Sequence, residues 1–323
     1  MNLQVYRTDS SSYQDSHFLA KEQKILESIP GVSYVKSLSQ TQKEIPFVLI
    51  TNTHTQIEHI PKTILDRTKL LVHPNSGYDN IGDEFVKKCS FPIVKGNPIR
   101  ANAVAEYMLS CVFKEIAQVP NHLHWSSTRV WKRPLLRDQK VLIIGNGHIG
   151  QLLKNSLRPL VSQLTVYDPF TKELGVENEF SHELFSKVNI LLIAADLNDT
   201  SYHMVEKVAL NELAKKNIII NPARGGIIKE EDLFDYLQQN SNSKCYLDVF
   251  EEEPFKAGFQ AKLSNLNKTS HIAGVFDRLN QDIISFEYLI IKDFLEKLAS
   301  DNSQTFYQDY SDCILNHEPT TIV

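Results

Sequence analysis

A glycine motif in the middle of the chain constrains the fold more than any other feature. The apolar run 141–144 is followed by Gly145, Gly147 and Gly150 at G-x-G-x-x-G spacing, and a second apolar run ends in Asp168. This order predicts a strand, a tight turn, a helix and a second strand, which open a parallel α/β sheet. In such a unit the helix N-terminus faces the pyrophosphate of a dinucleotide, and the acid can accept hydrogen bonds from the adenosine ribose.

Each glycine of this motif has its own expected role. Gly145 makes the turn, Gly147 lets the backbone approach a pyrophosphate, and Gly150 lets the helix pack closely against the strand. The alternative is that the glycines serve only a turn, but the strand before them and the acid-terminated strand after them favour a dinucleotide site. No Arg or Lys stands beside Asp168. Because a carboxylate there would repel a 2′-phosphate, the expected cofactor is NAD rather than NADP.

The size and charge of the chain exclude several classes of protein. A chain of 323 residues is long enough for two domains, and its net charge of −5 gives no electrostatic footprint for nucleic acid. It contains neither a long apolar run of the kind that spans a membrane nor a signal-peptide core at its start. We therefore expect a cytoplasmic protein with no nucleic-acid or membrane partner. Four scattered cysteines are expected to be reduced thiols: Cys89, Cys111, Cys245 and Cys313.

Short apolar runs alternate with helical patterns along most of the chain, which predicts two doubly wound parallel-sheet domains. The predicted strands begin at Leu3, Phe47, Lys69, Ile93, Val141, Leu164, Asn189, Asn217, Lys244 and Thr269. The fold class expected from this pattern is a Rossmann-type NAD domain inserted into a smaller, flavodoxin-like substrate domain. Residues 1–98 and 276–323 form the predicted substrate-binding domain, and residues 99–275 form the NAD-binding domain.

Two long apolar-periodic helices, Ala101–Ala117 and Leu279–Ala299, are expected to cross between the domains, with a hinge near Asn97 and Pro98. The polar tail from Ser300 onward carries only a weak packing signal. Residues 119–139 include two tryptophans but little periodicity, and we interpret them as an arm or a loop, of a kind that can cover a partner subunit. A homodimer is therefore the expected assembly.

One loop of the first domain is a candidate binding site for an anion. Asn75, Ser76 and Gly77 follow the strand that ends at Val72, and ligands of open α/β sheets bind at the carboxyl ends of strands. The backbone N–H groups of Ser76 and Gly77 could hold a carboxylate. The alternative is a simple turn built from Pro, Asn and Gly.

Three candidate catalytic residues fall at predicted strand ends in the second domain: Arg224, Glu253 and His271. Each alone has an ordinary explanation, namely a surface arginine, a solvated acidic run and a packed core histidine. Together, in one sheet that binds a dinucleotide, they suit the reduction of a 2-keto acid. The arginine would clamp the carboxylate, the histidine would donate a proton to the carbonyl oxygen, and the glutamate would hold the histidine and keep it protonated.

At these residues the chain resembles the D-isomer-specific 2-hydroxyacid dehydrogenase family. The resemblance spans about residue 47 to residue 295 and follows the family's order of motifs. Its segments are Asn75–Ile81, Ala103–Tyr107, Gly145–Gln151, Tyr167–Pro169, Asn221–Gly226, Leu247–Pro254 and His271–Gly274. It implies catalytic roles for Arg224, Glu253 and His271, substrate binding by Asn75, Ser76 and Gly77, and cofactor binding by Gly145, Gly147, His148, Ile149, Gly150, Asp168 and Asp248.

Three positions depart from the family pattern. His148 stands where the family usually has Arg, Ser270 replaces a usual Pro, and Ala194–Leu197 replaces a pattern with His and Pro. None of these changes removes the three catalytic candidates. A metal site at His122 and His124 is not expected, because i, i+2 spacing points the two rings to different faces of a helix and no Cys or acid joins them.

The resemblance implies an NAD-dependent dehydrogenase that interconverts a small 2-keto acid and a D-2-hydroxy acid. Two alternatives stay open on the same fold. One is an NAD(H)-sensing binding protein of the co-repressor type, which can retain the three residues. The other is a formate-type dehydrogenase, against which Glu253 argues because Gln normally stands there.

Overall fold

The computed structural model describes residues 2–42, 44–117, 125, 127–128, 133–256, 258, 262–300 and 302–316. The chain divides into two compact units. The first unit comprises residues 1–100 and 276–323, and the second comprises residues 101–275. These limits lie two residues from the predicted boundary on the N-terminal side and coincide with it at residue 276. Each unit is an α/β sandwich around one parallel sheet.

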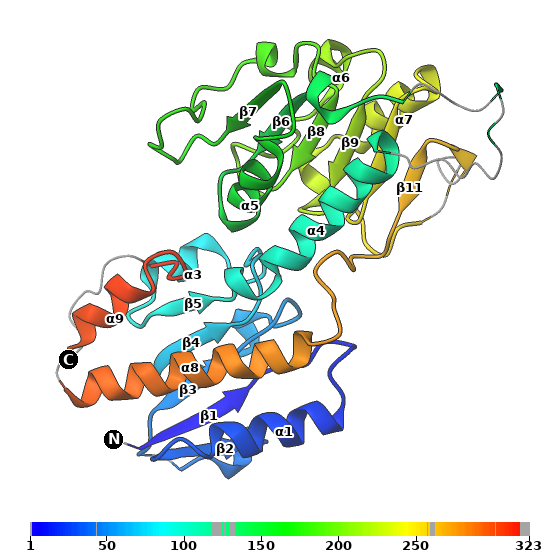
Figure 1. Cartoon of the computed structure of the whole chain (residues 1–323). Helices are drawn as coiled ribbons and strands as arrows, with labels where there is room; N and C mark the ends of the chain where they lie inside the picture. Colours follow the sequence, from blue (N-terminus) through cyan, green and yellow to red (C-terminus); the bar gives the residue numbers. More distant parts are fainter. Residues whose placement is uncertain are drawn as a thin grey trace. The chain divides into compact units, whose positions relative to one another are not determined.

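The sheet of the first unit has the strand order β2-β1-β3-β4-β5 (Figure 1), and all its neighbouring strands are parallel. Its strands are β1 (Leu3–Arg7), β2 (Val32–Val35), β3 (Phe47–Ile50), β4 (Thr68–His73) and β5 (Ile93–Lys95). This is the doubly wound, flavodoxin-like order. The sequence pattern predicted β1, β3, β4 and β5 and missed β2, whose residues are only partly buried.

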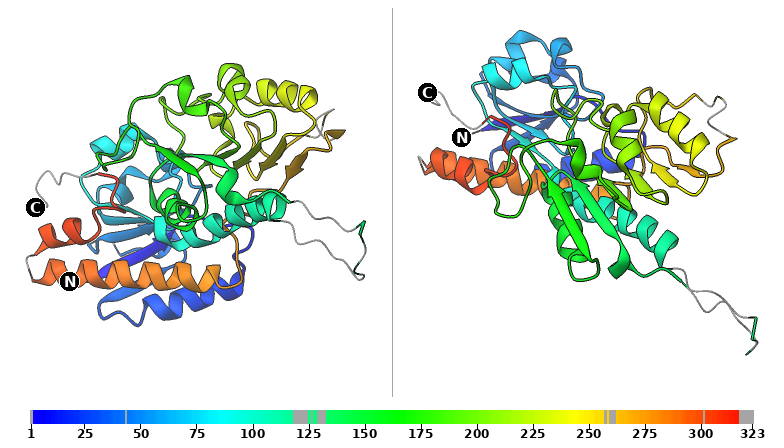
Figure 2. Two further views of the ribbon diagram at one scale, coloured as in Figure 1. Left: turned by 45° about the horizontal axis from the view of Figure 1, so that its top comes forward. Right: turned by 90° about the horizontal axis from the view of Figure 1, so that it is seen from above.

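Alternating strand residues of the first unit face two apolar layers. One layer packs against α1 (Ser16–Leu26), α8 (Leu279–Ala299) and α9 (Ser303–Asp309), and Figure 2 shows α8 running along the sheet beside α1. The other layer lies under the short helices α2 (Lys62–Leu65) and α3 (Asp83–Lys88). Because both faces are covered, the central strand β3 is fully buried and reads as a continuous apolar run, and β4 beside it is nearly so.

The sheet of the second unit has the order β11-β10-β9-β8-β6-β7, again with every neighbouring pair parallel. Its strands are β6 (Lys140–Ile144), β7 (Gln163–Tyr167), β8 (Ile190–Ile193), β9 (Ile218–Asn221), β10 (Lys244–Leu247) and β11 (Leu266–Lys268). The chain moves from β6 to β7 on one side and then returns to β8 on the other. The crevice between β6 and β8 is therefore the topological switch point, where sheets of this kind bind ligands.

Helices cover both faces of the second sheet as well. α4 (Asn97–Ile116) and α5 (His148–Leu157) pack on one face, and α6 (Lys207–Glu212) and α7 (Glu230–Gln239) pack on the other. The fold class predicted from the sequence, two doubly wound parallel-sheet units with one inserted into the other, is confirmed.

Three local predictions were wrong. Helix α4 begins at Asn97 rather than after a break at Asn97 and Pro98. Proline fits the first turn of a helix because the backbone N–H groups there make no hydrogen bond within the helix. The last strand of the second sheet is β11, so residues 269–274 form a loop. The polar tail packs closely: α9 buries Phe306, and Leu315 N donates to Ile93 O at 3.0 Å beside β5.

Among the described residues, no helix is both long enough and apolar enough to cross a membrane. In the same residues, no group of three or more His, Cys, Asp or Glu side chains could hold a metal ion. His122 and His124 lie outside the residues that the structure describes, as does most of segment 119–139. All four cysteines are unbridged.

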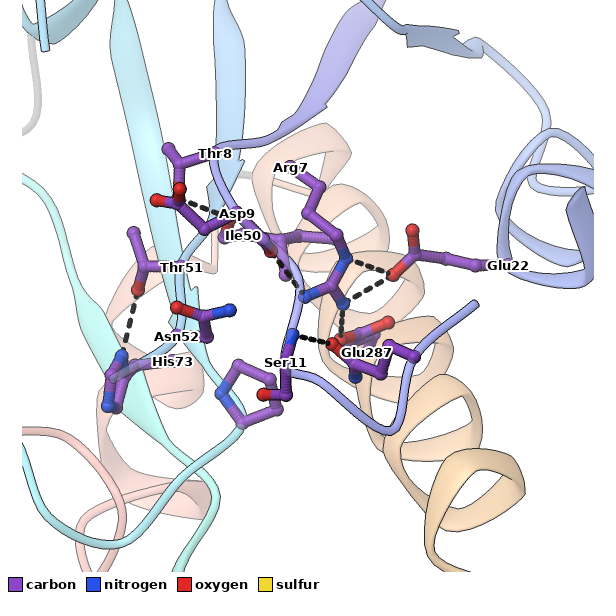
Figure 3. A network of polar contacts seen from close by, with 12 residues as sticks. Arg7, Thr8, Asp9, Ser11, Glu22, Ile50, Thr51, Asn52, His73 and Glu287 are labelled. Atoms are coloured by element: carbon purple, nitrogen blue, oxygen red, sulfur yellow. Dashed lines mark hydrogen bonds and ion pairs between the residues drawn. The ribbon is translucent and has the colours of Figure 1, made fainter. Parts of the chain in front are cut away.

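A buried ion cluster joins β1, α1 and α8 inside the first unit (Figure 3). Arg7 Nε donates to Glu22 Oε1 at 2.8 Å, and Arg7 Nη2 donates to Glu287 Oε1 at 2.5 Å. Tyr34 donates its hydroxyl to Glu22 Oε2 at 2.6 Å. Glu22 and Glu287 are fully buried. Burial raises the pKa of Glu287 well above its ordinary value; the Arg7 charge opposes this shift and the Glu22 charge adds to it. One guanidinium therefore does not hold both carboxyls in the ionised form.

We predict that Glu287→Gln removes part of the pH dependence of stability. Above the ordinary pKa of the carboxyl and below its raised folded pKa, the folded chain holds a proton that the unfolded chain has lost. The Glu287 contribution therefore makes stability fall as pH rises, with a slope of up to about 1.4 kcal/mol per pH unit. Denaturant unfolding from pH 4 to 9, compared between the wild type and the variant, measures this slope. Glu84→Gln on the exposed side of α3 is the matched control, and equal slopes in all three proteins would contradict the prediction.

Candidate active site

The glycine loop of the second unit is held by backbone contacts that leave no room for side chains at two of its three glycines. Gly145 has a positive φ of 97°, and a Cβ there would lie 2.5 Å from Ala194 O. A Cβ on Gly150 would lie 2.0 Å from Gly145 O. The loop between β6 and α5 therefore rests directly on the residue that follows β8. The expected structural roles of Gly145 and Gly150 agree with these contacts.

Gly147 differs from the other two glycines. It is the N-cap of α5, its φ of −68° suits any residue, and a Cβ there would meet nothing within 4 Å. The free space lies beside the N-terminus of α5, where the N–H groups of His148 and Ile149 begin the helix and favour negative charge. An open backbone cradle at the switch point, next to a helix N-terminus, fits the pyrophosphate of a dinucleotide.

Asp168 follows the end of β7 and orders the same loop. Its Oδ2 accepts from Asn146 N at 2.8 Å, and its Oδ1 accepts from Phe170 N at 2.9 Å. The carboxylate is partly exposed, so its remaining lone pairs can accept from the hydroxyls of a ribose. This position fits the role expected from the sequence.

The three catalytic candidates lie in loops that follow adjacent strands of the second sheet. Arg224 follows β9, Glu253 follows β10 and His271 follows β11. His271 Nδ1 is 2.9 Å from Glu253 Oε2, and Glu253 Oε1 accepts from Phe250 N at 3.1 Å. A Cβ on Gly225 would lie 1.9 Å from Phe250 C, so the Arg224 loop packs directly on the loop that carries Glu253.

The electrostatics of Glu253 show that the three groups influence each other. Burial by itself would raise the pKa of Glu253. The hydrogen bonds with His271 and from Phe250 N, together with the charges of His271 and Arg224, outweigh burial and lower the pKa. Glu253 is therefore ionised throughout the neutral range. An anionic carboxylate on Nδ1 fixes the orientation of the His271 ring.

The backbone of His271 is in the left-handed region, with φ of 56°, which is uncommon for a residue other than glycine. Asp248, at the end of β10, holds this conformation. Its carbonyl accepts from His271 N at 2.7 Å, and its carboxylate accepts from Ile272 N and Ala273 N at 2.8 Å each. Strained backbone persists where surrounding contacts over-determine it, and it is concentrated at functional sites.

Asp248 was predicted to bind the cofactor, and the structure gives its carboxylate a further task. It is 1% exposed, and besides the two N–H groups it accepts from Thr269 Oγ1 at 2.6 Å. Tyr107 OH is 2.8 Å from Thr269 Oγ1. Burial raises the pKa of Tyr107 to about 12, so its hydroxyl stays protonated and can donate to Thr269. A chain of hydrogen bonds thus runs from α4 to the His271 loop, and no spacing in the sequence indicated it.

A second histidine–glutamate pair lies near the first and was also missed. His203 Nε2 is 2.5 Å from Glu251 Oε1, and His203 N donates to Gly226 O at 2.8 Å. The Tyr202 ring stacks on His203 with centroids 3.9 Å apart. His203 also has a positive φ, of 50°. These contacts brace the loop that follows Arg224, so we assign the pair a structural role.

The predicted substrate loop belongs to the first unit. His73, which ends β4, is fully buried, and its Nε2 donates to Gly77 O at 2.9 Å because a carbonyl oxygen can only accept. Its Nδ1 is 2.9 Å from Thr51 Oγ1 (Figure 3). Gly96 N donates to both His73 O and Asn75 O. The loop with Asn75, Ser76 and Gly77 is therefore held at the carboxyl edge of its own sheet.

A doubly wound fold with a glycine loop at its switch point, an acid after the second strand and an Arg–Glu–His cluster defines an NAD(P)-binding α/β protein. Residues 108–273, just over half of the chain, match the model of the "D-isomer specific 2-hydroxyacid dehydrogenase, NAD binding domain". The chain therefore belongs to the D-isomer specific 2-hydroxyacid dehydrogenase family, and NAD is the cofactor that its second unit binds.

Individual relatives have low sequence identity to this chain. The chain is 27% identical over 241 residues to erythronate-4-phosphate dehydrogenase of Psychrobacter sp. (strain PRwf-1), a match that covers 72% of this chain and 62% of that relative. D-lactate dehydrogenase from Aquifex aeolicus, solved with NAD and lactic acid, matches 98% of this chain and 100% of its own with a TM-score of 0.70 and 17% identity. An NADPH-dependent glyoxylate/hydroxypyruvate reductase from Sinorhizobium meliloti, solved with NADP, has a TM-score of 0.67 and 15% identity, covering 91% of this chain and 94% of that one. The two structures show the same fold.

Gly147→Ala and Gly150→Ala should separate cofactor binding from stability. Gly147→Ala puts a methyl group into open space, so we expect an unchanged melting temperature and weaker NADH binding. Gly150→Ala forces α5 away from Gly145 O and should destabilise the protein by about 1–3 kcal/mol. Thermal unfolding and NADH fluorescence titration measure the two effects. If Gly147→Ala bound NADH as tightly as the wild type, the pyrophosphate would not lie against this glycine.

Proposed function

We propose that this protein is an NAD-dependent oxidoreductase that interconverts a 2-keto acid and a D-2-hydroxy acid. The observation that carries the proposal is the 2.9 Å contact between His271 and Glu253, in a cluster where Arg224 also acts on the Glu253 carboxylate. Membership of the family supports the same reaction class. The chain matches only 62% of the length of the erythronate-4-phosphate dehydrogenase from Psychrobacter sp.. The proposal therefore rests on the residues of this chain and on its family.

The three residues divide the work of ketone reduction. Arg224 would bind the substrate carboxylate through two N–H groups, which fixes the keto carbon in place. Glu253 occupies Nδ1 of His271, so Nε2 is the ring nitrogen that can donate a proton to the carbonyl oxygen. Bound NADH would supply the hydride to the carbonyl carbon. Hydride and proton together convert C=O into CH–OH, and the reverse reaction returns the proton to neutral His271.

We also propose a substrate-binding role for the loop at the carboxyl edge of the first unit's own sheet. Asn75, Ser76 and Gly77 are proposed to hold the substrate through their peptide groups, as the family resemblance implies. A homodimer and a cytoplasmic location stay predictions of the sequence.

The test is a screen of NADH consumption with small 2-keto acids, both polar (glyoxylate, hydroxypyruvate) and apolar (pyruvate, branched-chain and aromatic acids). We expect activity on at least one of them, lost by about a hundred- to ten-thousand-fold in His271→Ala because the proton donor is gone. His203→Asn is the matched control: asparagine tolerates a positive φ, and the second pair is structural, so activity should stay near wild type. Tight NADH binding without turnover of any acid would instead favour an NAD(H)-sensing protein.

The role of Glu253 predicts a shifted pH profile. Reduction needs protonated His271, so kcat/KM falls at alkaline pH. In Glu253→Gln the anion that stabilises the imidazolium is lost, so this fall should move to lower pH, and the rise in hydroxy-acid oxidation should move with it. Measuring kcat/KM against pH in both directions tests this. Glu252→Gln removes the same charge from an exposed neighbour paired with Lys256 and should leave the profile unchanged. An unmoved profile in Glu253→Gln would remove Glu253 from the mechanism.

A further inference from the structure

A buried lysine lies beside the glycine loop of the second unit. Lys154 is on α5 and is 8% exposed. Its Nζ donates to Glu173 Oε1 at 2.7 Å and to Asn146 Oδ1 at 3.1 Å. Asn146 Nδ2 in turn donates to Glu173 Oε2 at 2.7 Å. The three side chains form a closed ring of hydrogen bonds, which we call the Lys154 ring.

The Lys154 ring adjoins the acid that is expected to bind the ribose. Asn146 stands between Gly145 and Gly147, and its backbone N donates to Asp168 Oδ2 at 2.8 Å. Asp168 N donates to Glu177 O at 2.9 Å, so the intervening segment, which carries Glu173, leaves β7 and returns to it. Two carboxylates, those of Asp168 and Glu173, therefore contact the same residue of the glycine loop, one through its main chain and one through its side chain.

The hydrogen-bonded charges of this corner are the Lys154 ammonium and the carboxylates of Asp168 and Glu173, and the charge of Arg158 also acts on Glu173. Hydrogen bonds from Lys154 and Asn146 lower the pKa of Glu173, so its carboxyl is ionised at neutral pH. The Glu173 side chain is 45% exposed, whereas that of Lys154 is 11% exposed. Glu173 thus covers the ammonium on its solvent side and neutralises it. The sequence showed no cation next to Asp168, and the fold brings Lys154, from the middle of α5, to the same residue of the glycine loop, Asn146, that Asp168 contacts.

We propose that Glu173 is a second determinant of cofactor choice, which keeps Lys154 from pairing with the 2′-phosphate of NADP. An ammonium is a good point-charge partner for phosphate, so an uncovered Lys154 near Asp168 would favour NADP. Paired with Glu173, the Lys154 ammonium offers no net charge to a phosphate, and the carboxylate of Asp168 repels one. The inference rests on the proposed cofactor site and adds to it a residue that discriminates between NAD and NADP.

The direct test compares the dissociation constants of NADPH and NADH for the wild type and Glu173→Gln by fluorescence titration. Glutamine keeps an acceptor for Lys154 but removes the charge. We expect the NADPH Kd to fall about tenfold, which is the scale of the attraction between one ammonium and one phosphate partly screened by solvent. The NADH Kd should stay within about twofold of the wild-type value. Glu173→Ala should give the same change, and Glu173→Asp should restore most of the wild-type ratio because it keeps the anion.

Two controls identify the cation and the charge. Adding Lys154→Met to Glu173→Gln should abolish the gain for NADPH, because the gain depends on the uncovered ammonium. Glu84→Gln changes the net charge equally but breaks an exposed Lys–Glu pair of the first unit, and it should leave both constants unchanged. Melting temperatures and NADH binding report whether each variant is folded.

The outcomes separate this inference from the proposed function. If the wild type binds NADH and Glu173→Gln and Glu173→Ala leave the NADPH Kd unchanged, the role of Glu173 is wrong and the proposed function stands. If Glu173→Gln still binds NADPH more tightly after Lys154→Met is added, the inference is also overturned, because the cation that binds the phosphate would then not be Lys154. If the wild type binds neither dinucleotide, the proposed function fails first and this inference fails with it.

Discussion

The second unit depends on direct contact between backbone segments at the carboxyl edge of its sheet. At Gly145, Gly150 and Gly225 an added Cβ would lie 1.9–2.5 Å from a backbone atom of a neighbouring loop. Contacts this close exist only where no side chain intervenes. They lock the loop that would receive the pyrophosphate onto β8 and the loop with Arg224 onto the segment that follows β10. The cofactor loop and the candidate catalytic cluster are therefore parts of one packed edge.

Asp248 extends this rigidity to the residue that would transfer the proton. A buried carboxylate is stable only when its oxygens are satisfied, and here backbone N–H groups and Thr269 satisfy them. The same bonds hold His271 in a left-handed conformation that it would rarely adopt alone. The strain of that one residue is thus offset by the polar groups around it. Glu253 then needs only a single hydrogen bond to orient the ring.

Much of this architecture was predictable because its signals are local. The apolar runs of β3, β6 and β8 and the periodic helix α8 are visible in a few consecutive residues, and the spacing of Gly145, Gly147 and Gly150 placed the switch point. The errors occurred where tertiary contacts outweigh local preference. The segment 269–274, predicted as a strand, is a loop because Asp248 accepts hydrogen bonds from the backbone N–H groups of His271, Ile272 and Ala273. The polar tail packs because Ile314 and Leu315 pair with β5.

The sequence by itself determined the class of fold, and it predicted the cofactor loop and the three candidate residues Arg224, Glu253 and His271, because parallel strands bring their carboxyl ends to one edge whatever their separation along the chain. The tertiary structure alone showed that a neighbouring acid of the same run, Glu251, pairs with His203, which was not a candidate in the sequence. It alone placed Lys154 and Glu173 together beside Asp168. Side-chain pairs of this kind depend on how loops return to the sheet, and loop paths are set by long-range packing that no local pattern records.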